Sequence, residues 1–472
     1  EMSNDTSGLD RRTVLKSAGA TGVTAGAAGC SALFGGGDDT TTTSVGDGGD
    51  GDGDGDGGDG DGGTTQTPQE GDPLNAGLLS FTQGPAAVLG LQAVRGAELA
   101  VQHINENGGV GGSRELNLET VDEGDSALDK YNSFIDQGKD VTFGPISSGT
   151  HQQLAPEVES SEVINVATDG TVTTLYEETV TDPTYSFRFQ NYDAMETTAA
   201  AREAVSRMGA ENINTVAGVN PGYSFGEDEM SLFSAAIQKL TGAEIVYEGL
   251  PDLLSDDYST HISQINSREP DLVFSSLWGG DASTFLEQAL SRGMFDNIEA
   301  TIGTVYYGSA DAIPQAVLDG VDEGTIMSGS RNYYWGHPNL DRSEASRSLF
   351  DEARNMDGIK VPTAHFMSGY GAVMCWATAV EKAWNVLGSY PSQEQIAAAL
   401  EGHGFYTPGG YYNMSMDHQG RGNGYAGLMT WNSDIDAPEL VDTNAYSATE
   451  ISPPPQGSRY EVTAQNWISS WS

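Results

Sequence analysis

Beyond Leu74 the chain alternates short apolar segments with amphipathic ones, and this alternation restricts the folds open to it. The apolar segments have strand length and are bounded by Gly, Pro, Asp or Asn; they lie at residues 74–81, 116–121, 141–145, 163–167, 213–220, 243–249, 272–277, 300–304 and 324–329. Between them, apolar residues recur at helical spacings of three and four, at residues 95–105, 128–135, 197–207, 233–240, 283–290 and 366–384. Strand and helix in alternation predict an α/β fold in which helices cover both faces of parallel sheets.

The alternating segments are about twice as many as one such sheet needs. A chain of 472 residues also suits two domains, at about 100 to 200 residues each. We therefore predict two Rossmann-like lobes. Because ligands on such sheets bind at the carboxyl ends of the strands, the sequence further predicts a ligand cleft between the lobes.

The chain is strongly acidic, with a formal net charge of −47 and only 21 Lys and Arg residues. No basic stripe is available to displace counterions from phosphates, which excludes nucleic acid as a partner. At about 1 M salt the Debye length is only about 3 Å, so the acidic groups hardly repel one another. The composition therefore indicates a halophilic, archaeal source.

The N-terminal segment carries two targeting signals. Arg11 and Arg12 form a twin-arginine export motif, and the stretch that follows, 18–29, is too short and too rich in Gly and Thr to span a bilayer. Ala-Ala-Gly before Cys30 resembles a lipobox. We predict that residues 1–29 are a cleaved signal peptide and that Cys30 carries a lipid that anchors the protein on the extracytoplasmic face of the membrane. The alternative is a disordered N-terminus with a chance cysteine.

Residues 30–72 consist largely of Gly, Asp and Thr, with almost nothing to bury, and we expect a disordered tether. Some of its residues approach the spacing of a calcium-binding EF-hand loop: Asp50, Asp52, Asp54, Gly55 and Asp61. The flanking helices and the final Glu of that motif are absent, so a charged spacer is the better interpretation.

Cysteine and histidine usage argues against structural disulfides and metal cofactors. The second cysteine, Cys375, lies in an apolar helical pattern and is predicted to be a small core residue. The seven His residues include no pair at metal-ligand spacing, so we expect no zinc site and no cofactor.

Several short motifs occur in a fixed order along the chain, at residues 82–85 (TQGP), 104–112 (INENGGVGG), 143–149 (FGPISSG), 222–226 (GYSFG), 256–258, 270–274, 280–283, 285–289 and Gly293. In this order they resemble the type I solute-binding proteins of ABC importers, in particular the branch of the leucine, isoleucine and valine receptors. The resemblance runs from about Leu74 to Trp431. It implies a receptor, not an enzyme, that holds a small solute between two hinged lobes and delivers it to membrane permease subunits.

The resemblance also implies that each lobe is built from discontinuous segments. Lobe 1 would comprise residues 73–190 plus 328–422, and lobe 2 residues 191–327 plus 423–450. The chain would cross between the lobes near residues 189–192, 324–331 and 420–424, and a C-terminal tail, 451–472, would follow. Such crossings can absorb a hinge rotation that a ligand drives by contacting both lobes.

A carboxylate-binding site is expected at the start of the helix that follows residues 143–147. Ser148 is placed to cap this helix, and the N–H groups of Gly149 and Thr150 would face the cleft with its hydroxyl. Ser148 matches the Ser with which the family holds its ligand's acid group, and Gly170 and Thr171 match a second contacting pair, with Gly in place of Ala. The alternatives are a simple N-cap for Ser148 and a turn residue for Thr171.

Aromatic residues are expected to form the opposite wall. Phe225 and Trp278 match two Tyr positions that line the family's pocket from lobe 2; the alternative is ordinary core packing. Tyr306 is a further ligand-contact candidate, followed by more weakly placed rings at Tyr307, Tyr333, Tyr334 and Trp335.

One departure from the family bears on the solute. After the strand at 300–304, where amino-acid receptors place a Glu against the ligand ammonium, this chain has Val305 and Tyr306. Asp193 or Asp281 would have to replace that Glu, since a buried ammonium without a carboxylate is costly. Otherwise the solute is a carboxylate without an amino group, an amide or an aromatic acid.

The sequence allows two other functions, a serine hydrolase and a ligand-sensing domain. The segment 222–226 fits the G-x-S-x-G turn of serine hydrolases, which would use Ser224, Asp271 and either His365 or His403. No oxyanion-hole motif accompanies it, so we rank this interpretation lower. A ligand-sensing domain of the same fold would need a membrane span or an output domain, and none is evident after Leu74.

Overall fold

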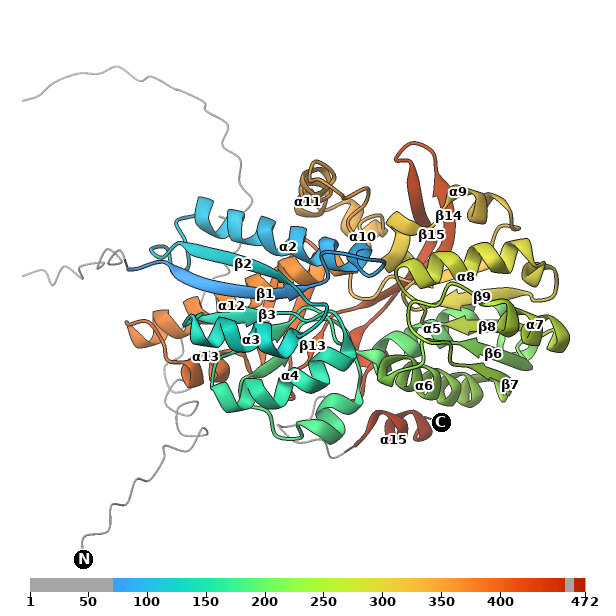
Figure 1. Cartoon of the computed structure of the whole chain (residues 1–472), viewed down its shortest axis with the longest axis horizontal. Helices are drawn as coiled ribbons and strands as arrows, with labels where there is room; N and C mark the ends of the chain where they lie inside the picture. Colours follow the sequence, from blue (N-terminus) through green and yellow to red (C-terminus); the bar gives the residue numbers. More distant parts are fainter. Residues whose placement is uncertain (1–70, 455–461, 472) are drawn as a thin grey trace, which may run out of the picture. The chain divides into compact units, whose positions relative to one another are not determined.

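The computed structural model describes residues 71–454 and 462–471 (Figure 1). The predicted twin-arginine signal, the lipidated Cys30 and the acidic tether therefore lie outside the described residues. Within the described ranges no helix is both long and apolar enough to cross a membrane.

The first sheet is wholly parallel, with strand order β2-β1-β3-β4-β5. Its strands are β1 (Leu74–Ser80), β2 (Leu116–Asp122), β3 (Val141–Phe143), β4 (Asn165–Ala167) and β5 (Ser186–Arg188). The helices beside it are α2 (Ala87–Glu106), α3 (Ala127–Asp136), α4 (Ser148–Ser161), α11 (Glu344–Arg354), α12 (Ala364–Leu387) and α13 (Gln393–Leu400). Figure 1 shows α2 and α12 on one face of the sheet and α3 and α4 on the other. We call this body lobe 1.

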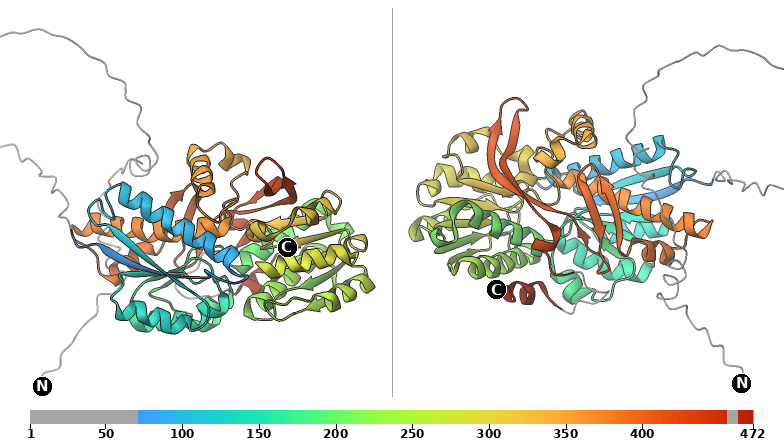
Figure 2. Two further views of the ribbon diagram at one scale, coloured as in Figure 1. Left: turned by 45° about the horizontal axis from the view of Figure 1, so that its top comes forward. Right: turned by 180° about the vertical axis from the view of Figure 1, so that it is seen from behind.

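The second sheet has strand order β15-β14-β10-β9-β8-β6-β7 and is parallel from β7 to β10. Its strands are β6 (Thr215–Val219), β7 (Glu244–Gly249), β8 (Leu272–Ser275), β9 (Ala300–Gly303), β10 (Ile326–Gly329), β14 (Gly424–Asn432) and β15 (Ala437–Tyr446). Its helices are α5 (Asp193–Met208), α6 (Ser224–Thr241), α7 (Ser259–Arg268), α8 (Gly280–Ser291), α9 (Gln315–Asp319) and α14 (Ala448–Ile451). This body is lobe 2, and Figure 2 shows its antiparallel hairpin β14–β15 at one edge.

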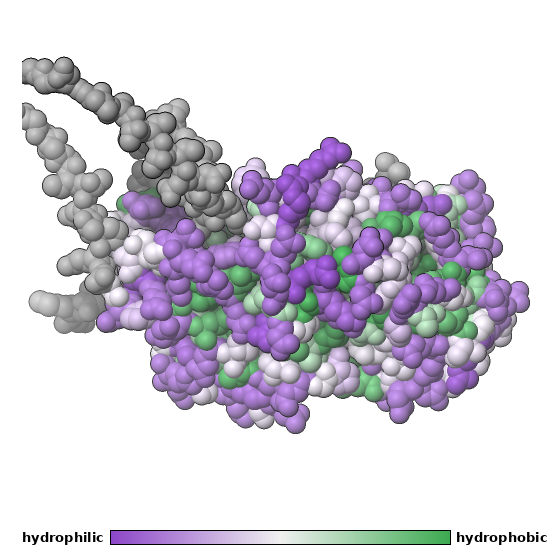
Figure 3. Space-filling view, turned by 90° about the horizontal axis from the view of Figure 1, so that it is seen from above, coloured by the Kyte–Doolittle hydropathy of each residue, from purple (hydrophilic) through white to green (hydrophobic). Residues whose placement is uncertain are grey.

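The apolar segments predicted from the sequence coincide with β1 to β4 and β6 to β10, and the two-lobed α/β fold is confirmed. A small antiparallel sheet was not predicted; it comprises β11 (His403–Thr407), β12 (Gly410–Met414) and β13 (Gly420–Arg421). The space-filling view shows a surface dominated by hydrophilic side chains, as the acidic composition requires (Figure 3).

The chain passes between the two large sheets three times: between β5 and α5, between β10 and the short helix α10 (Pro338–Asp341), and between β13 and β14. The second crossing begins at residue 330 and so overlaps the expected residues 324–331 only at their end, because residues 326–329 form β10 of the second sheet. The lobe limits given above remain predictions.

The C-terminal segment packs on lobe 2. In α15 (Ala464–Ser469), Ala464 and Ile468 join the core beneath α5 and α6, and Trp467 and Trp471 pack against the same core. The N–H of Ala464 donates to Glu177 Oε1 at 2.7 Å, and Glu177 belongs to a helical turn of lobe 1. The tail therefore contacts both lobes.

The two longest helices of lobe 1 cross at glycines. A Cβ atom on Gly96 of α2 would lie 1.9 Å from the carbonyl oxygen of Phe366, and one on Gly369 of α12 would lie 1.9 Å from that of Ala93. Cys375 lies buried on α12, which confirms it as a core residue.

We expect Gly96→Ala to destabilise the protein by about 1–3 kcal/mol, because backbone atoms of α12 would have to move. Helix propensity alone would favour Ala by about 0.5–1 kcal/mol, so the sign of the change is the test. Gly149→Ala is the matched control, since its Cβ would meet nothing nearer than 3.7 Å. Urea unfolding measures both changes; a stabilised Gly96→Ala would contradict the described packing.

Candidate functional site

A small cavity lies where the two lobes meet. Its lining residues are Leu89, Ile146, Ser148, Asp169, Thr171, Tyr223, Phe225, Trp278, Val305, Arg331 and His365. Residues from lobe 1, from lobe 2 and from the second crossing all contribute. The cavity lies beyond the carboxyl ends of strands in both sheets, as such folds require of a ligand site.

The N-terminus of α4 forms one wall, but its cap is not the residue we predicted. Ser147 caps the helix, with its Oγ accepting from Thr150 N at 3.4 Å. Its backbone is extended, as a cap requires, whereas Ser148 is already the first helical residue. The Ser148 hydroxyl instead accepts from Val172 N at 3.2 Å and lines the cavity.

A buried carboxyl group that the sequence analysis missed occupies part of this helix end. Glu123 accepts from Ile146 N at 2.7 Å and from Ser147 N at 2.9 Å. Burial raises the pKa of Glu123 to about 7, although these two hydrogen bonds act against the rise. No described contact supplies an acceptor for the N–H of Ser148 or Gly149, so these two donors are left for a ligand.

The loop after β4 contributes Thr171 but not Gly170. Gly170 has a φ of 70°, and a Cβ there would lie 2.7 Å from His151, so the Gly that replaces the family's Ala is required by conformation. Its carbonyl accepts from Arg188 Nη1 at 2.8 Å and points away from the cavity lining. Thr171 lines the cavity beside Ser148, whose hydroxyl accepts from the N–H of the next residue, Val172.

Aromatic rings of lobe 2 form the facing wall. Phe225 and Trp278 both line the cavity and are 3% and 5% exposed. Tyr223 lies 6.0 Å from Phe225, centroid to centroid, and Phe81 of lobe 1 stacks on Trp278 at 6.2 Å. These rings, with Leu89, Ile146 and Val305, give the cavity a largely apolar lining.

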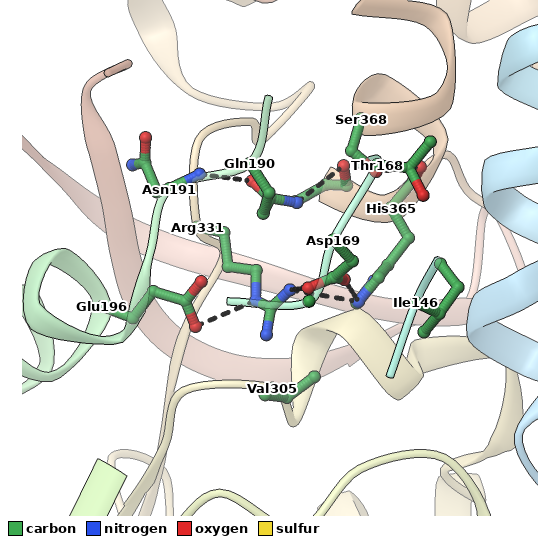
Figure 4. A network of polar contacts seen from close by, with 12 residues as sticks. Ile146, Thr168, Asp169, Gln190, Asn191, Glu196, Val305, Arg331, His365 and Ser368 are labelled. Carbon is green, nitrogen blue, oxygen red and sulfur yellow. Dashed lines mark hydrogen bonds and ion pairs between the residues drawn. The ribbon is translucent and has the colours of Figure 1, made fainter. Parts of the chain in front are cut away.

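A buried ionic cluster closes the remaining side (Figure 4). Arg331 Nη1 contacts both carboxylate oxygens of Asp169 at 2.7 Å, and His365 Nε2 lies 2.9 Å from Asp169 Oδ2. Arg331 Nε lies 3.0 Å from Glu196 Oε2. Because Asp169 belongs to lobe 1, Glu196 to lobe 2 and Arg331 to the second crossing, the cluster ties the lobes together at the hinge.

The protonation states in this cluster follow from competing effects. Burial acts to raise the pKa of Asp169, but Arg331 and His365 outweigh it and hold that pKa below its usual value. Burial lowers the pKa of His365 despite the nearby carboxylate. Burial opposes the charge of Arg331, yet Asp169 and Glu196 keep the pKa of the guanidinium raised. At neutral pH the cavity therefore faces a guanidinium, a carboxylate and a neutral imidazole.

Five predicted contact residues do not line the cavity: Gly149, Thr150, Gly170, Asp193 and Tyr306. Asp193 is buried at the start of α5, where its N–H donates to Thr171 O at 3.0 Å. Tyr306 packs over Gly303, and its hydroxyl lies 3.3 Å from Thr301 Oγ1. Its neighbour Val305 lines the cavity instead.

Asp281 is likewise remote from the cavity lining. It lies on α8, and its Oδ2 accepts from Leu254 N at 2.8 Å. Gly149 and Thr150 lie in the first turn of α4 but are not among the residues that line the cavity. The ligand roles predicted from the sequence for all these residues remain predictions.

Asp169, Tyr223 and Arg331 line the cavity but were not predicted to do so from the sequence. His365 was predicted only as a hydrolase residue. Two of these residues could have been predicted from their place after a strand. Asp169 follows β4 and Arg331 follows β10, and ligands bind at the carboxyl ends of such strands. His365 gave no such signal, since it reaches the cavity from the start of α12.

The predicted hydrolase triad is not assembled. Asp271 accepts from the N–H groups of Asn214 and Thr215 at the start of β6, whereas Ser224 follows the opposite end of that strand. His365 is held by Asp169, and His403 Nε2 lies 2.9 Å from Thr378 Oγ1 in lobe 1. The G-x-S-x-G pattern is therefore a turn that leads into α6.

Comparisons with known proteins agree with this geometry. The chain is 23% identical over 359 residues to a leucine-, isoleucine-, valine-, threonine- and alanine-binding protein of Pseudomonas aeruginosa, covering 74% of this chain and 87% of that protein. It is 23% identical over 342 residues to the Leu/Ile/Val-binding protein homolog 1 of Brucella abortus, covering 71% and 84%.

Two solved structures have the same fold. One is an ABC transporter solute-binding protein of R. palustris in complex with benzoate, with a TM-score of 0.66 and 19% identity over 79% of this chain and 98% of that one. The other is the closed conformation of the leucine-, isoleucine-, valine-, threonine- and alanine-binding protein of Brucella ovis, with a TM-score of 0.67 and 19% identity over 82% and 98%. Residues 73–436, most of the described chain, match the profile of one family, and the protein belongs to it: the periplasmic binding proteins.

Proposed function

We propose that this protein is the extracytoplasmic receptor of an ABC importer and that it captures a small carboxylate-bearing solute between its lobes. The observation that carries the proposal is the shared cavity, with Ser148 and Thr171 on one wall and Phe225 and Trp278 on the other. A solute that touches both walls favours the closed arrangement, which is the form we expect the permease to recognise.

Three kinds of donor support a carboxylate in this cavity. The N–H groups of Ser148 and Gly149 lie at the positive end of the α4 dipole. The Thr171 side chain lines the cavity beside them. No hydrogen bond or ion pair among the described residues uses Nη2 of Arg331, which leaves a charged donor beside the cavity. The benzoate and amino-acid ligands in the names of similar proteins fit the same chemistry.

The cavity favours an acid without an amino group, or an amide, over a branched-chain amino acid. Asp169 is the one carboxylate among the lining residues, and it is already paired with Arg331 and His365. Where the amino-acid receptors place a Glu, the wall here is Val305. An ammonium group would therefore have to take Asp169 from its present partners or go uncompensated.

We further propose that the protein is a lipoprotein. The twin-arginine pair at Arg11 and Arg12 and the lipobox-like residues before Cys30 support export of the folded chain and attachment through a lipid. The acidic composition supports a halophilic setting.

A thermal-shift screen in molar salt tests the solute class. We expect saturable increases in Tm with short-chain or aromatic carboxylates, and smaller ones with leucine, isoleucine and valine. Ser148→Ala combined with Thr171→Val should weaken binding of the best carboxylate about 10²- to 10⁴-fold, because hydrogen bonds to a charged group contribute about 1.5–3 kcal/mol each. Isothermal titration measures this change.

The fold should survive the double substitution, at a cost of about 1–2 kcal/mol for the Val172 N–H left without its acceptor. The control is Ser263→Ala on α7, whose hydroxyl bonds only to the carbonyl of Ser259 in its own helix. Unchanged carboxylate affinity in the folded double variant would refute the site.

A further inference from the structure

Three buried carboxyl groups lie together in lobe 2, outside the solute cavity. Asp193 and Glu196 stand one turn apart at the start of α5, and Glu229 reaches them from α6. Each offers one carboxylate oxygen, and these atoms all lie within 4.8 Å of one another. Asp193 and Glu229 are 0% exposed and Glu196 is 5% exposed, so bulk water does not separate these carboxyl groups.

Oxygens in this cluster point inward without hydrogen-bond donors. No hydrogen bond of good geometry reaches either carboxylate oxygen of Asp193, although the side chains of Thr171 and Asp228 lie close to it. Oε1 of Glu229 also lacks a donor, and its Oε2 accepts from Thr304 Oγ1 at 2.7 Å. Glu196 makes its ion pair with Arg331 through Oε2, and its Oε1 has no donor. Buried polar atoms in native proteins almost always have a hydrogen-bond partner. Several neighbouring carboxylate oxygens without one therefore indicate a bound ligand or ion.

The positive charge nearby is too small to balance the cluster. Arg331 contacts the cluster through Glu196 but is shared with Asp169 of lobe 1, and the buried Arg188 acts on Glu196 and Asp228 without a contact to either. Asp228, on α6 beside Glu229, adds a further half-buried carboxyl close to Asp193. Ionising several of these acids a few ångströms apart in a dry interior costs more than the nearby guanidinium groups offset, so without a cation the acids hold protons.

We propose that Asp193, Glu196 and Glu229 together bind one hard metal cation of the size of calcium. The mutual spacing of up to 4.8 Å is about twice the 2.3–2.6 Å of a calcium–oxygen bond, so one ion can contact all three residues. Carboxylate oxygens are the ligands such ions prefer. Magnesium fits less well, because it retains several waters and these residues leave little room for them.

The position of the cluster argues against the ammonium group of a solute as its occupant. None of the three residues lines the solute cavity, and a solute seated between Ser148 and Phe225 does not reach them there. Glu196 instead borders a second small cavity, which it lines with Arg331 and Thr304.

A cation here would organise the wall of the solute site. Asp193 begins α5 directly after the first crossing, and its N–H holds the carbonyl of Thr171, which lines the solute cavity. Glu196 contacts Arg331 Nε, and Arg331 Nη1 in turn donates to Asp169 of the other lobe. Cation and solute should therefore increase each other's affinity, by reciprocal coupling. The site goes beyond the proposed function and does not depend on which solute binds.

The test uses the full chain, freed of metal with a chelator and kept in about 1 M choline chloride. That salt screens surface charge to a Debye length of about 3 Å without supplying a small cation. Isothermal titration with calcium chloride should give one ion per chain and a saturable rise in Tm. Magnesium should bind more weakly. No saturable heat with calcium, or a rise in Tm that only follows ionic strength, would overturn the proposal.

Two variants locate the site. Asp193→Asn and Glu229→Gln should each lower calcium affinity by more than the 10- to 100-fold typical of losing an outer-shell partner, because each removes a direct ligand. Glu203→Gln is the matched control: Glu203 is equally buried on α5, but Arg207, Asn444 and Tyr446 already satisfy it. Its calcium affinity should stay unchanged.

The stability of the metal-free variants separates loss of a ligand from loss of the fold. Without calcium, Asp193→Asn and Glu229→Gln should unfold close to the temperature of the parent protein, because each amide replaces a carboxyl group that holds its proton when no cation is bound. Wild-type calcium affinity in either variant would refute the assignment. A protein that binds calcium but none of the tested carboxylates would refute the proposed solute class and leave the cation site standing.

Discussion

Replacing Arg331 with methionine should lower the free energy of unfolding by about 3–5 kcal/mol, which is the loss expected when one partner of a buried ion pair is removed. Methionine fills much of the space of the arginine stem, so cavity formation contributes little. The cost arises because Asp169 and Glu196, both buried, would lose the guanidinium that contacts them. Urea unfolding in molar salt measures the change.

A second substitution tests the cause. Adding Asp169→Asn to Arg331→Met should restore part of the lost stability, because it removes a carboxylate left without a partner. Arg331→Lys should recover less, since an ammonium cannot reproduce the contacts that Nη1 and Nε make with two different acids. A loss below about 1 kcal/mol for Arg331→Met would show that the cluster does not hold the lobes together.

In calcium-free buffer the protein should lose stability as the pH rises from 6.5 to 8.5. Burial raises the pKa of Glu123 to about 7, that of Glu177 to about 7 and that of Glu196 to about 8. A carboxyl group whose pKa is higher in the native than in the unfolded state binds its proton more tightly when folded. Its stabilising effect is complete below the unfolded pKa and disappears as the pH passes the folded one.

Below pH 6.5 buried histidines oppose this trend, which is why the upper window is the informative one. Burial lowers the pKa of His151 to about 3 and that of His403 to about 4, so their contribution is lost as the pH falls, not as it rises. Between pH 6.5 and 8.5 the three carboxyl groups should together remove about 3 kcal/mol.

Urea unfolding at fixed salt and three pH values measures this slope. Glu123→Gln should flatten it, because the amide resembles the protonated acid and still accepts from Ile146 N or Ser147 N. Stability that is constant or rises across the window would contradict the buried, protonated state of these carboxyl groups.

The fold could be predicted from the sequence to the extent that it rests on local patterns. Strands such as β1 and β8 are buried on both faces and therefore read as continuous apolar runs. Strand β5 is only three residues long and contains Arg188, and the hairpin β14–β15 alternates buried and exposed residues irregularly. Neither leaves an apolar run, and both were missed.

The site was predicted as far as the family motifs extend. Ser148, Thr171, Phe225 and Trp278 all line the cavity. The ionic cluster was not foreseen because its members are brought together by tertiary structure alone, from a loop, a crossing and two helices far apart in the sequence. The N-cap of α4 was predicted at Ser148 and is Ser147. Both serines are suitable caps, and only the backbone conformation distinguishes them.

The three crossings also determine the order in which the ribosome supplies the parts of lobe 1. Helix α2 packs along α12, which is translated only after all the strands of lobe 2 up to β10. A nascent chain stopped before α12 would leave α2 and the neighbouring face of β3 and β4 bare, the kind of apolar surface that chaperones bind. Shortening the gene from its 3′ end therefore removes β15 and β14 of lobe 2 before it reaches α12 of lobe 1, and neither lobe can be expressed as one continuous fragment.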